Sequence, residues 1–148
     1  FQRSYPFGVV RLAEECGDRQ QRQRIIDAAL HDCQHQVGGA AGSQVTLIGT
    51  AGTMTTLAAV DLGLRHYDPH LINNHRLHIA RLRQIAAHLT PLTVAQRESV
   101  AGMEPGRGDL ILPGIQIAAA LAKALASSEI LIADAGLLEG TFLRACRN

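Results

Sequence analysis

The residues best suited to phosphate chemistry form one short segment, Gly49-Thr50-Ala51-Gly52-Thr53. It follows a β-branched apolar run at 44–48, a predicted buried strand, and precedes a helical pattern at 54–62. A strand that turns into a helix points free amides and the positive end of the helix dipole at one place, which favours an anion. The glycines let a ligand approach the backbone. The segment is neither a P-loop nor a dinucleotide fingerprint. It therefore predicts either phosphate contact or a turn that only allows tight helix–sheet packing.

Two further loops contain residues that could line a cleft with this segment. Asp134 and Gly136 follow a predicted buried strand at 129–133, and ligands of open α/β sheets bind beyond the carboxyl ends of strands. Asp134 could position a water or a metal ion there, or it could cap the following helix. Arg107 lies in a glycine-flanked loop at 104–109, from which its guanidinium could bind two phosphate oxygens. Its alternative role is structural, as the partner of Asp109 or of a backbone carbonyl.

The histidines and cysteines do not predict a metal site. His31 and His35 are four residues apart on a predicted helix, with Cys33 between them, which is a spacing compatible with zinc. However, Cys33 lies about 200° around the helix from His31, on the apolar face, so the histidines should project to solvent. No third ligand is evident. The three cysteines include no C-x-x-C pair and favour reduced thiols in the cytoplasm.

An alternation of strands and helices must position these residues. Strands are expected at 44–48 and 129–133, with the end of another at 1–5. Helices are expected at 9–13, from Asp18 to about 37, and at 54–62, 77–89, 93–100, 110–126 and 137–146. Asp109 should cap the apolar helix 110–126, which should be central. Two strand–turn–helix units predict an α/β fold with at least two parallel strands.

Composition and charge describe one nearly neutral domain. The chain has 148 residues, and 47% of them are hydrophobic, which is enough for a packed core. Lys and Arg total 14 against 13 Asp and Glu, a net charge of +1 that excludes a strongly basic nucleic-acid module. Aromatic residues are 3% of the chain, which excludes a stacking platform for single strands. No apolar run reaches the roughly 18 residues of a membrane span. Because the chain starts at Phe1, we expect a longer parent, with the remaining strands before this residue.

The order of these segments resembles that of the Ppx/GppA family, the exopolyphosphatases and guanosine pentaphosphate phosphohydrolases. The matching segments are PFGVVRL at 6–12, IGTAGTMTTLAA at 48–59, YDP at 67–69, MEPGRGD at 103–109, LPG at 112–114 and DAGLLEG at 134–140. The resemblance implies a ribonuclease-H-like fold of the actin-like ATPase type, in which two α/β domains face a phosphate-binding cleft. Residues 1–148 would be a single domain, the C-terminal one of such a phosphatase.

The resemblance also implies an activity for the parent protein. That activity is Mg²⁺-assisted release of terminal phosphate from inorganic polyphosphate or from guanosine pentaphosphate. The phosphate loop and the water-activating glutamate belong to the family's first domain, so we expect no catalytic residue and no hydrolysis in this chain alone. Residues 49–53 would bind phosphate or nucleotide, and Arg107, Asp134 and Gly136 would line the cleft. The metal would be bound mainly outside this chain.

The sequence departs from the family in its closing motif. Ala135 and Leu138 stand where the family commonly has arginines, which removes two positive charges near the expected cleft. An alternative is therefore that the parent senses or binds a nucleotide alarmone without hydrolysing it. Another is that the apolar helix 110–126 forms a homodimer. The expected partners are polyphosphate or guanosine polyphosphate, the family's first domain and a second copy, with no membrane and no specific nucleic acid.

Overall fold

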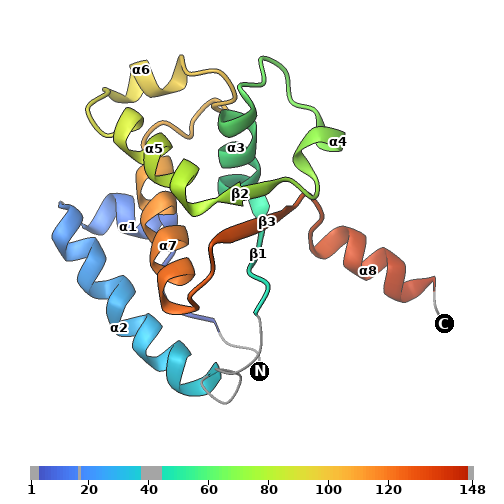
Figure 1. Ribbon diagram of the computed structural model, residues 1–148, viewed down its shortest axis with the longest axis horizontal. Helices are drawn as coiled ribbons and strands as arrows, with labels where there is room; N and C mark the ends of the chain where they lie inside the picture. The colour runs from blue at the N-terminus through green and yellow to red at the C-terminus, as the bar shows by residue number, and fades with distance from the viewer. Residues whose placement is uncertain (1–3, 17, 38–44, 147–148) are drawn as a thin grey trace.

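The computed structural model describes residues 4–16, 18–37 and 45–146, which form helices gathered on a small sheet (Figure 1). In chain order the elements are α1 (Val9–Glu15), α2 (Arg19–Val37), β1 (Ile48–Thr50), α3 (Ala51–Leu62), α4 (Pro69–Ile72), β2 (Arg76–His78), α5 (Ile79–Leu89), α6 (Val94–Glu98), α7 (Ile111–Ala124), β3 (Glu129–Ala133) and α8 (Leu137–Ala145). None of the described helices is long and apolar enough to cross a membrane.

The sheet has the strand order β1-β3-β2, with β3 in the centre. β1 runs parallel to β3 and pairs Thr50 with Ala133, whereas β2 is antiparallel and pairs Leu77 with Ile130. The predicted α/β class with two parallel strands is therefore confirmed. The parallel register also brings the carboxyl ends of β1 and β3 side by side. The start of α3 and the chain after β3 consequently meet at one edge of the sheet.

The main core lies between the sheet and the helices α3, α5 and α7. β3 alternates half-buried and buried side chains, so Ile130 and Ile132 share one apolar face. That face packs against Leu57 of α3, Leu82 of α5 and Ile115 of α7, whose side chains are almost fully buried. Burial of apolar area, worth about 25 cal/mol per Å², therefore holds these helices on one side of the sheet.

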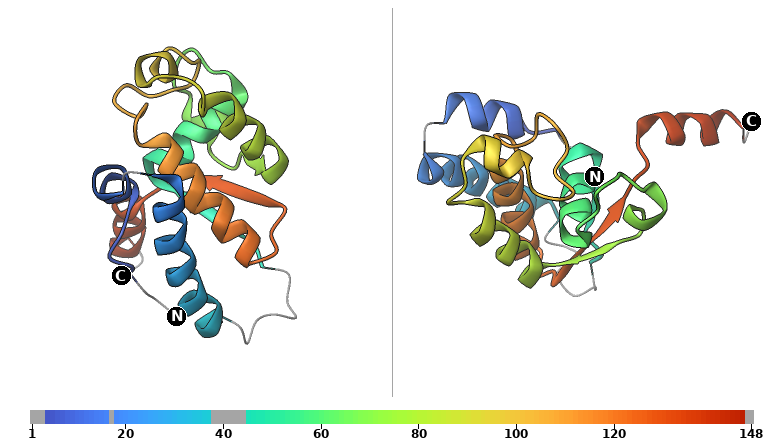
Figure 2. Two further views of the ribbon diagram at one scale, coloured as in Figure 1. Left: turned by 90° about the vertical axis from the view of Figure 1, so that its left-hand side faces the viewer. Right: turned by 90° about the horizontal axis from the view of Figure 1, so that it is seen from above.

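α7 is the central helix, as its apolar sequence predicts. On its other side a second core cluster forms around Leu12 of α1, Ile26 of α2 and Ala120 of α7. Figure 2, left, shows α7 crossing between α2 and α5. The apolar side chains of α7 that motivated a homodimer are thus largely covered by the chain's own helices.

Local sequence signals explain where several helices begin. Asp18 Oδ1 accepts a hydrogen bond from the amide of Gln21 at 2.8 Å, so it caps α2 as predicted. Asp68 accepts from the amide of His70 at 2.9 Å, and a proline follows it at the first helical position. At α6, Thr93 and Gln96 form the reciprocal hydrogen bonds of a capping box, which confirms the predicted start.

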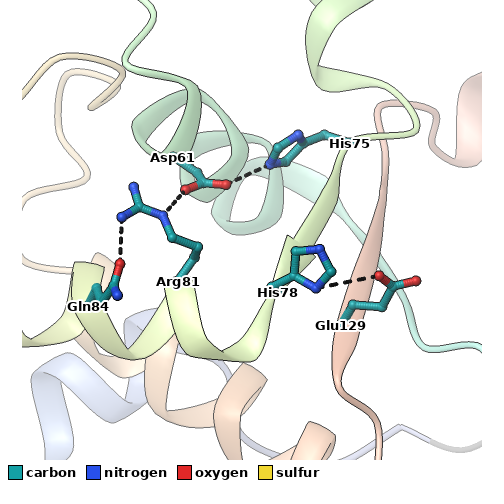
Figure 3. A network of polar contacts seen from close by, with 6 residues as sticks. All are labelled: Asp61, His75, His78, Arg81, Gln84 and Glu129. Atoms are coloured by element: carbon teal, nitrogen blue, oxygen red, sulfur yellow. Dashed lines mark hydrogen bonds and ion pairs between the residues drawn. The ribbon is translucent and has the colours of Figure 1, made fainter.

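Polar side chains tie α3 to the elements that follow it (Figure 3). Asp61 of α3 accepts from Nε of Arg81 on α5 at 2.9 Å, and its other oxygen lies 2.9 Å from Nε2 of His75, just before β2. Only 11% of the Asp61 side chain is exposed. A second contact crosses the sheet, where Glu129 of β3 pairs with Arg76 of β2.

α8 projects away from the rest of the molecule (Figures 1 and 2). It occupies the predicted place after β3 and leaves four large apolar side chains more than half exposed. These are Leu137, Leu138, Phe142 and Leu143.

The structure corrects several predictions about the bounds and caps of these elements. The first strand runs over Ile48–Thr50 instead of 44–48, and Ile48 is 56% exposed because β1 is an edge strand. The helix expected at 77–89 starts at Ile79, because residues 76–78 pair with β3 as a strand. Asp109 does not cap the long helix, since the turn at 108–110 makes Leu110 the N-cap of α7. The strand end predicted at 1–5 lies partly outside the described residues, and residues 4–5 are not in a strand.

Candidate functional site

The first turn of α3 begins directly at the carboxyl end of β1. Thr50 ends the strand and is the N-cap, and Ala51 starts the helix with φ at +69°. This left-handed conformation costs a residue with a side chain about 1–2 kcal/mol. The Thr50 side chain makes no capping hydrogen bond within the described structure, so the first-turn amides remain available to a ligand. Strained backbone of this kind clusters at functional sites.

The two glycines of this segment lie in different environments. Gly49 packs beneath Met54, and a Cβ at this position would come 2.7 Å from Met54 Cγ. Gly52 faces Arg107, and a Cβ here would lie 2.8 Å from the guanidinium carbon. Gly49 therefore allows helix–sheet packing. Gly52 instead lets a cationic side chain lie against the N-terminus of α3.

Glu104 holds Arg107 in this position. Nε of Arg107 donates to Glu104 Oε2 at 3.1 Å, and the same oxygen accepts from Oγ1 of Thr56 on α3 at 3.3 Å. The side chains of Arg107 and Glu104 are 31% and 52% exposed, so water screens the pair and it contributes little to stability. An anionic ligand could thus replace Glu104 at small cost. Within the described residues, the acid that pairs with Arg107 is Glu104 and not the predicted Asp109.

The loop that presents Arg107 is fixed against α3. Gly102 has φ at +85°, and a Cβ there would overlap the backbone of Ala59. On the other side of the loop, Nη1 of Arg97 donates to the carbonyl of Gly108 at 3.0 Å. The position of Arg107 is therefore set by backbone contacts on both sides of it.

Asp134 reaches the same edge of the sheet from β3. The register of β1 and β3 sets it beside the start of α3, and its amide donates to Asn73 Oδ1 at 3.0 Å. Partial burial of the phenol raises the pKa of Tyr67, and a hydrogen bond to Asp134 raises it further. Tyr67 and Asp134 therefore lie close to one another at this edge of the sheet. The predicted alternative, in which Asp134 caps α8, is wrong because the N-cap is Gly136.

The amide of Gly136 takes part in the cap of α8. This amide donates to Glu139 Oε2 at 2.7 Å and closes a capping interaction. Backbone hydrogen bonds, first from Gly136 and then from the amide of Glu139 itself, hold the pKa of the Glu139 carboxyl below its usual value. Glu139 therefore interacts with the start of α8, where a carboxylate complements the helix dipole.

The charges at the site limit what it can bind unaided. Arg107 pairs with the carboxylate of Glu104, and Asp134 adds a second carboxylate at the same edge of the sheet, so the positive potential comes from one guanidinium and the α3 N-terminus. In the part of the chain that the structure describes, no three His, Cys, Asp or Glu side chains form a group that could hold a metal ion. Mg²⁺ commonly uses one or two carboxylates together with substrate phosphates. Asp134 could serve as one such ligand, and further donors would have to come from elsewhere.

Several neighbours of the site were not singled out from the sequence as site residues. Tyr67, Glu104 and Thr56 contact the predicted residues. The sequence around them contains only weak indications of a binding site. Tyr67 begins the YDP loop, and Glu104 stands before a Pro-Gly turn. Among the predicted residues, Thr53 turns its methyl group toward Gly114 of α7. The predicted orientation of the His31 and His35 pair cannot be compared, because the side chain at 35 lies outside the described set.

One family model matches the whole chain. The model of the Ppx/GppA phosphatase family matches residues 1–148. Exopolyphosphatase 2 of Mycobacterium tuberculosis is 33% identical over 102 residues, which are 66% of this chain and 32% of that protein. The chain therefore spans about a third of this curated relative.

Solved structures share the fold. The Ppx/GppA phosphatase of Aquifex aeolicus superposes with a TM-score of 0.79 at 22% identity, covering 96% of this chain and 48% of that one. An exopolyphosphatase from Cytophaga hutchinsonii gives a TM-score of 0.82 at 19% identity, covering 99% and 50%. Each match thus covers nearly all of this chain and about half of its relative.

Proposed function

Because the chain belongs to the Ppx/GppA phosphatase family, we propose that it forms one wall of the phosphate-binding cleft of a phosphoanhydride hydrolase. The observation that supports this best is the position of Arg107 against Gly52, at the α3 N-terminus and beside the carboxyl ends of two parallel strands. The proposed reaction releases terminal phosphate from inorganic polyphosphate or guanosine pentaphosphate. The name of the mycobacterial relative favours polyphosphate.

The proposal includes the architecture of the whole protein. We assign the chain to a ribonuclease-H-like fold of the actin-like ATPase type, as its second domain. This chain covers about half of each solved relative, which supports the proposal that a first domain faces it across the cleft. The cytoplasm is the proposed location, in keeping with the free cysteines Cys16, Cys33 and Cys146.

This chain's part in the chemistry is to bind and orient phosphate. Oxygens of the phosphate chain would accept hydrogen bonds from the first-turn amides of α3 and from the Arg107 guanidinium. Such donors, fixed before the reaction, stabilise the charge that develops when water attacks the terminal phosphoryl group in line with the leaving oxygen. The base that activates this water is proposed to lie outside these 148 residues. Mg²⁺ would neutralise phosphate charge, held mainly by substrate and by residues outside this chain, with Asp134 as one ligand.

A binding experiment tests this assignment. We expect Arg107→Gln to weaken binding of tripolyphosphate and of guanosine pentaphosphate to the chain about tenfold, because a charged hydrogen bond contributes roughly 1.5–3 kcal/mol. Isothermal titration calorimetry measures the affinity, and exposed Arg65→Gln serves as the matched control. Equal losses for both variants, or none for Arg107→Gln, would contradict the proposal. Phosphate release by the chain alone would contradict the assignment of the base to another domain.

A non-hydrolytic nucleotide sensor is the second candidate. It is favoured by Ala135 and Leu138 in the closing motif and by the carboxylate of Glu104, which pairs with Arg107. The full-length protein distinguishes the two functions. Saturable binding of guanosine pentaphosphate without phosphate release supports the sensor, whereas turnover supports the hydrolase.

A further inference from the structure

A groove of about 1180 Å³ runs along α7 between α2 and α5. These two helices each pack on α7 (Figure 2, left), while any contact between them is small within the described residues. Side chains of α7 line the groove between them and form its floor. None of the residues that line it belongs to the site around Gly52, Arg107 and Asp134. The proposed phosphate cleft therefore leaves this groove without a role.

The floor has the shape that accepts another helix. The residues of α7 that line the groove follow helical spacing and form one stripe along the helix from Leu112 to Ala124. They are at positions 112, 115, 116, 119, 120, 123 and 124. At 1.5 Å per residue this stripe is about 18 Å long, the length of roughly three helical turns. Small side chains at Ala119 of α7 and Ala86 of α5 allow a second backbone to approach closely. Amphipathic helices bind to grooves of this kind through apolar side chains at helical spacing.

The rim of the groove is positively charged. Its lining includes Arg19, Arg22, Arg83 and Lys123 against Asp27, which gives 4 − 1 = +3. The whole chain has a net charge of +1, so the remainder sums to 1 − 3 = −2. The groove is therefore positively charged, whereas the rest of the chain has a net negative charge. Arg83 and Lys123 are exposed, and neither has an ion-pair partner among the described residues.

The groove is already formed in the free chain. Nε of Arg22 donates to Gln116 Oε1 at 2.7 Å near one end, and Nε2 of Gln34 donates to the carbonyl of Ala124 at 3.0 Å near the other. These bonds fix α2 on α7 at both ends of the stripe. A ligand would therefore bind without first having to order the walls.

We propose that this groove binds an acidic amphipathic helix of a partner protein. The apolar face of that helix packs on the alanine-rich floor, and its carboxylates meet Arg83, Lys123 and Arg19 on the rim. The exposed apolar helix α8 of a second copy is a poor occupant. Its described charges, Glu139 and Arg144, cancel and do not complement a basic rim.

A charge-reversal experiment tests the proposal. The probe is a fluorescent designed peptide of about 14 residues, helical, with leucines on one face and glutamates beside them. We expect it to bind the chain, and the double variant Arg83→Glu with Lys123→Glu to weaken binding at least tenfold. A peptide with lysines in place of the glutamates should prefer the double variant. Both substituted side chains are exposed, and circular dichroism checks that the fold is kept.

A charge reversal outside the groove serves as the control. Arg65→Glu reverses an exposed charge outside the groove and should leave peptide affinity unchanged. Equal binding of a scrambled peptide, or an equal loss in Arg65→Glu, overturns the proposal. Binding to phosphatidylglycerol vesicles or to tripolyphosphate at the groove, without binding of the peptide, overturns it in favour of a lipid or phosphate ligand.

Discussion

At the scale of single residues, the position of Arg107 depends on the missing side chain at Gly52 and on a buried backbone contact at Gly102. The two glycines serve different purposes. At position 52 the neighbour is the flexible end of an arginine, whereas at position 102 it is the backbone of α3. The same substitution should therefore affect ligand binding at one position and stability at the other.

Gly52→Ala is expected to reduce tripolyphosphate affinity about fivefold, because the new Cβ displaces the Arg107 guanidinium from the α3 N-terminus. Its free energy of unfolding should change by less than about 1 kcal/mol, since alanine is the better helix former. Gly102→Ala should lose about 2–4 kcal/mol of stability, from a positive φ and backbone overlap. Urea denaturation and calorimetry measure both quantities. A reversed pattern would show that the two glycines have been assigned the wrong roles.

At the scale of elements, α8 depends on its own cap more than on packing. Its large apolar side chains are exposed, so few tertiary contacts hold it in place. The hydrogen bond from the Gly136 amide to Glu139 is therefore prominent among its stabilising interactions. A contiguous exposed apolar face of this kind commonly marks an interaction surface.

The cap at Glu139 should make α8 sensitive to acid. The folded-state pKa of Glu139 lies below its ordinary value of 4.5, so the ionised carboxylate stabilises the helix above that pH. This stabilisation is lost as the pH falls through the folded pKa. We expect amide hydrogen exchange in α8, corrected for its intrinsic pH dependence, to indicate weaker protection below about pH 4. Glu139→Gln should remove this pH dependence, and the exposed control Glu14→Gln should leave it intact. Unchanged acid sensitivity in Glu139→Gln would assign the effect to another group.

At the scale of the whole molecule, polar contacts connect α3, the helix that forms the site, to α5 and to the edge strand β2. Asp61 lies at the end of α3 opposite to Gly52 and joins this helix to α5 and to the start of β2 (Figure 3). Because these elements also share the main core, the site and the core should unfold together. The network therefore affects global stability more than local order.

Asp61→Asn is expected to lower the free energy of unfolding by about 1–2 kcal/mol, because a nearly buried carboxylate loses its charged contacts with Arg81 and His75. Chemical denaturation monitored by circular dichroism measures the change. The exposed Asp27→Asn provides a control of the same chemistry and should cost less than about 0.5 kcal/mol. Equal effects of the two substitutions would show that burial of Asp61 does not matter.

Much of the architecture could be predicted because local signals and the final structure agree. The apolar run at 129–133 became β3 with the predicted bounds, and Asp18 and Thr93 cap the helices assigned to them. Prediction failed where pairing partners decide the conformation. Residues 76–78 have no strong strand pattern of their own and are extended because they pair with β3. Asp109 is a favourable capping residue but does not cap α7, because the turn at 108–110 makes Leu110 the N-cap.

The sequence by itself determined the α/β class, the family and the strand-to-helix position of the Gly49–Thr53 segment, because spacing along the chain encodes periodicity and motif order. Tertiary structure alone decided that Arg107 lies on Gly52, that Glu104 restrains it and that Tyr67 meets Asp134. These contacts join residues from separate loops and depend on strand register. Tertiary structure also decided that α2 and α5 flank α7 with a basic groove between them, because a groove depends on how helices pack and not on any one segment.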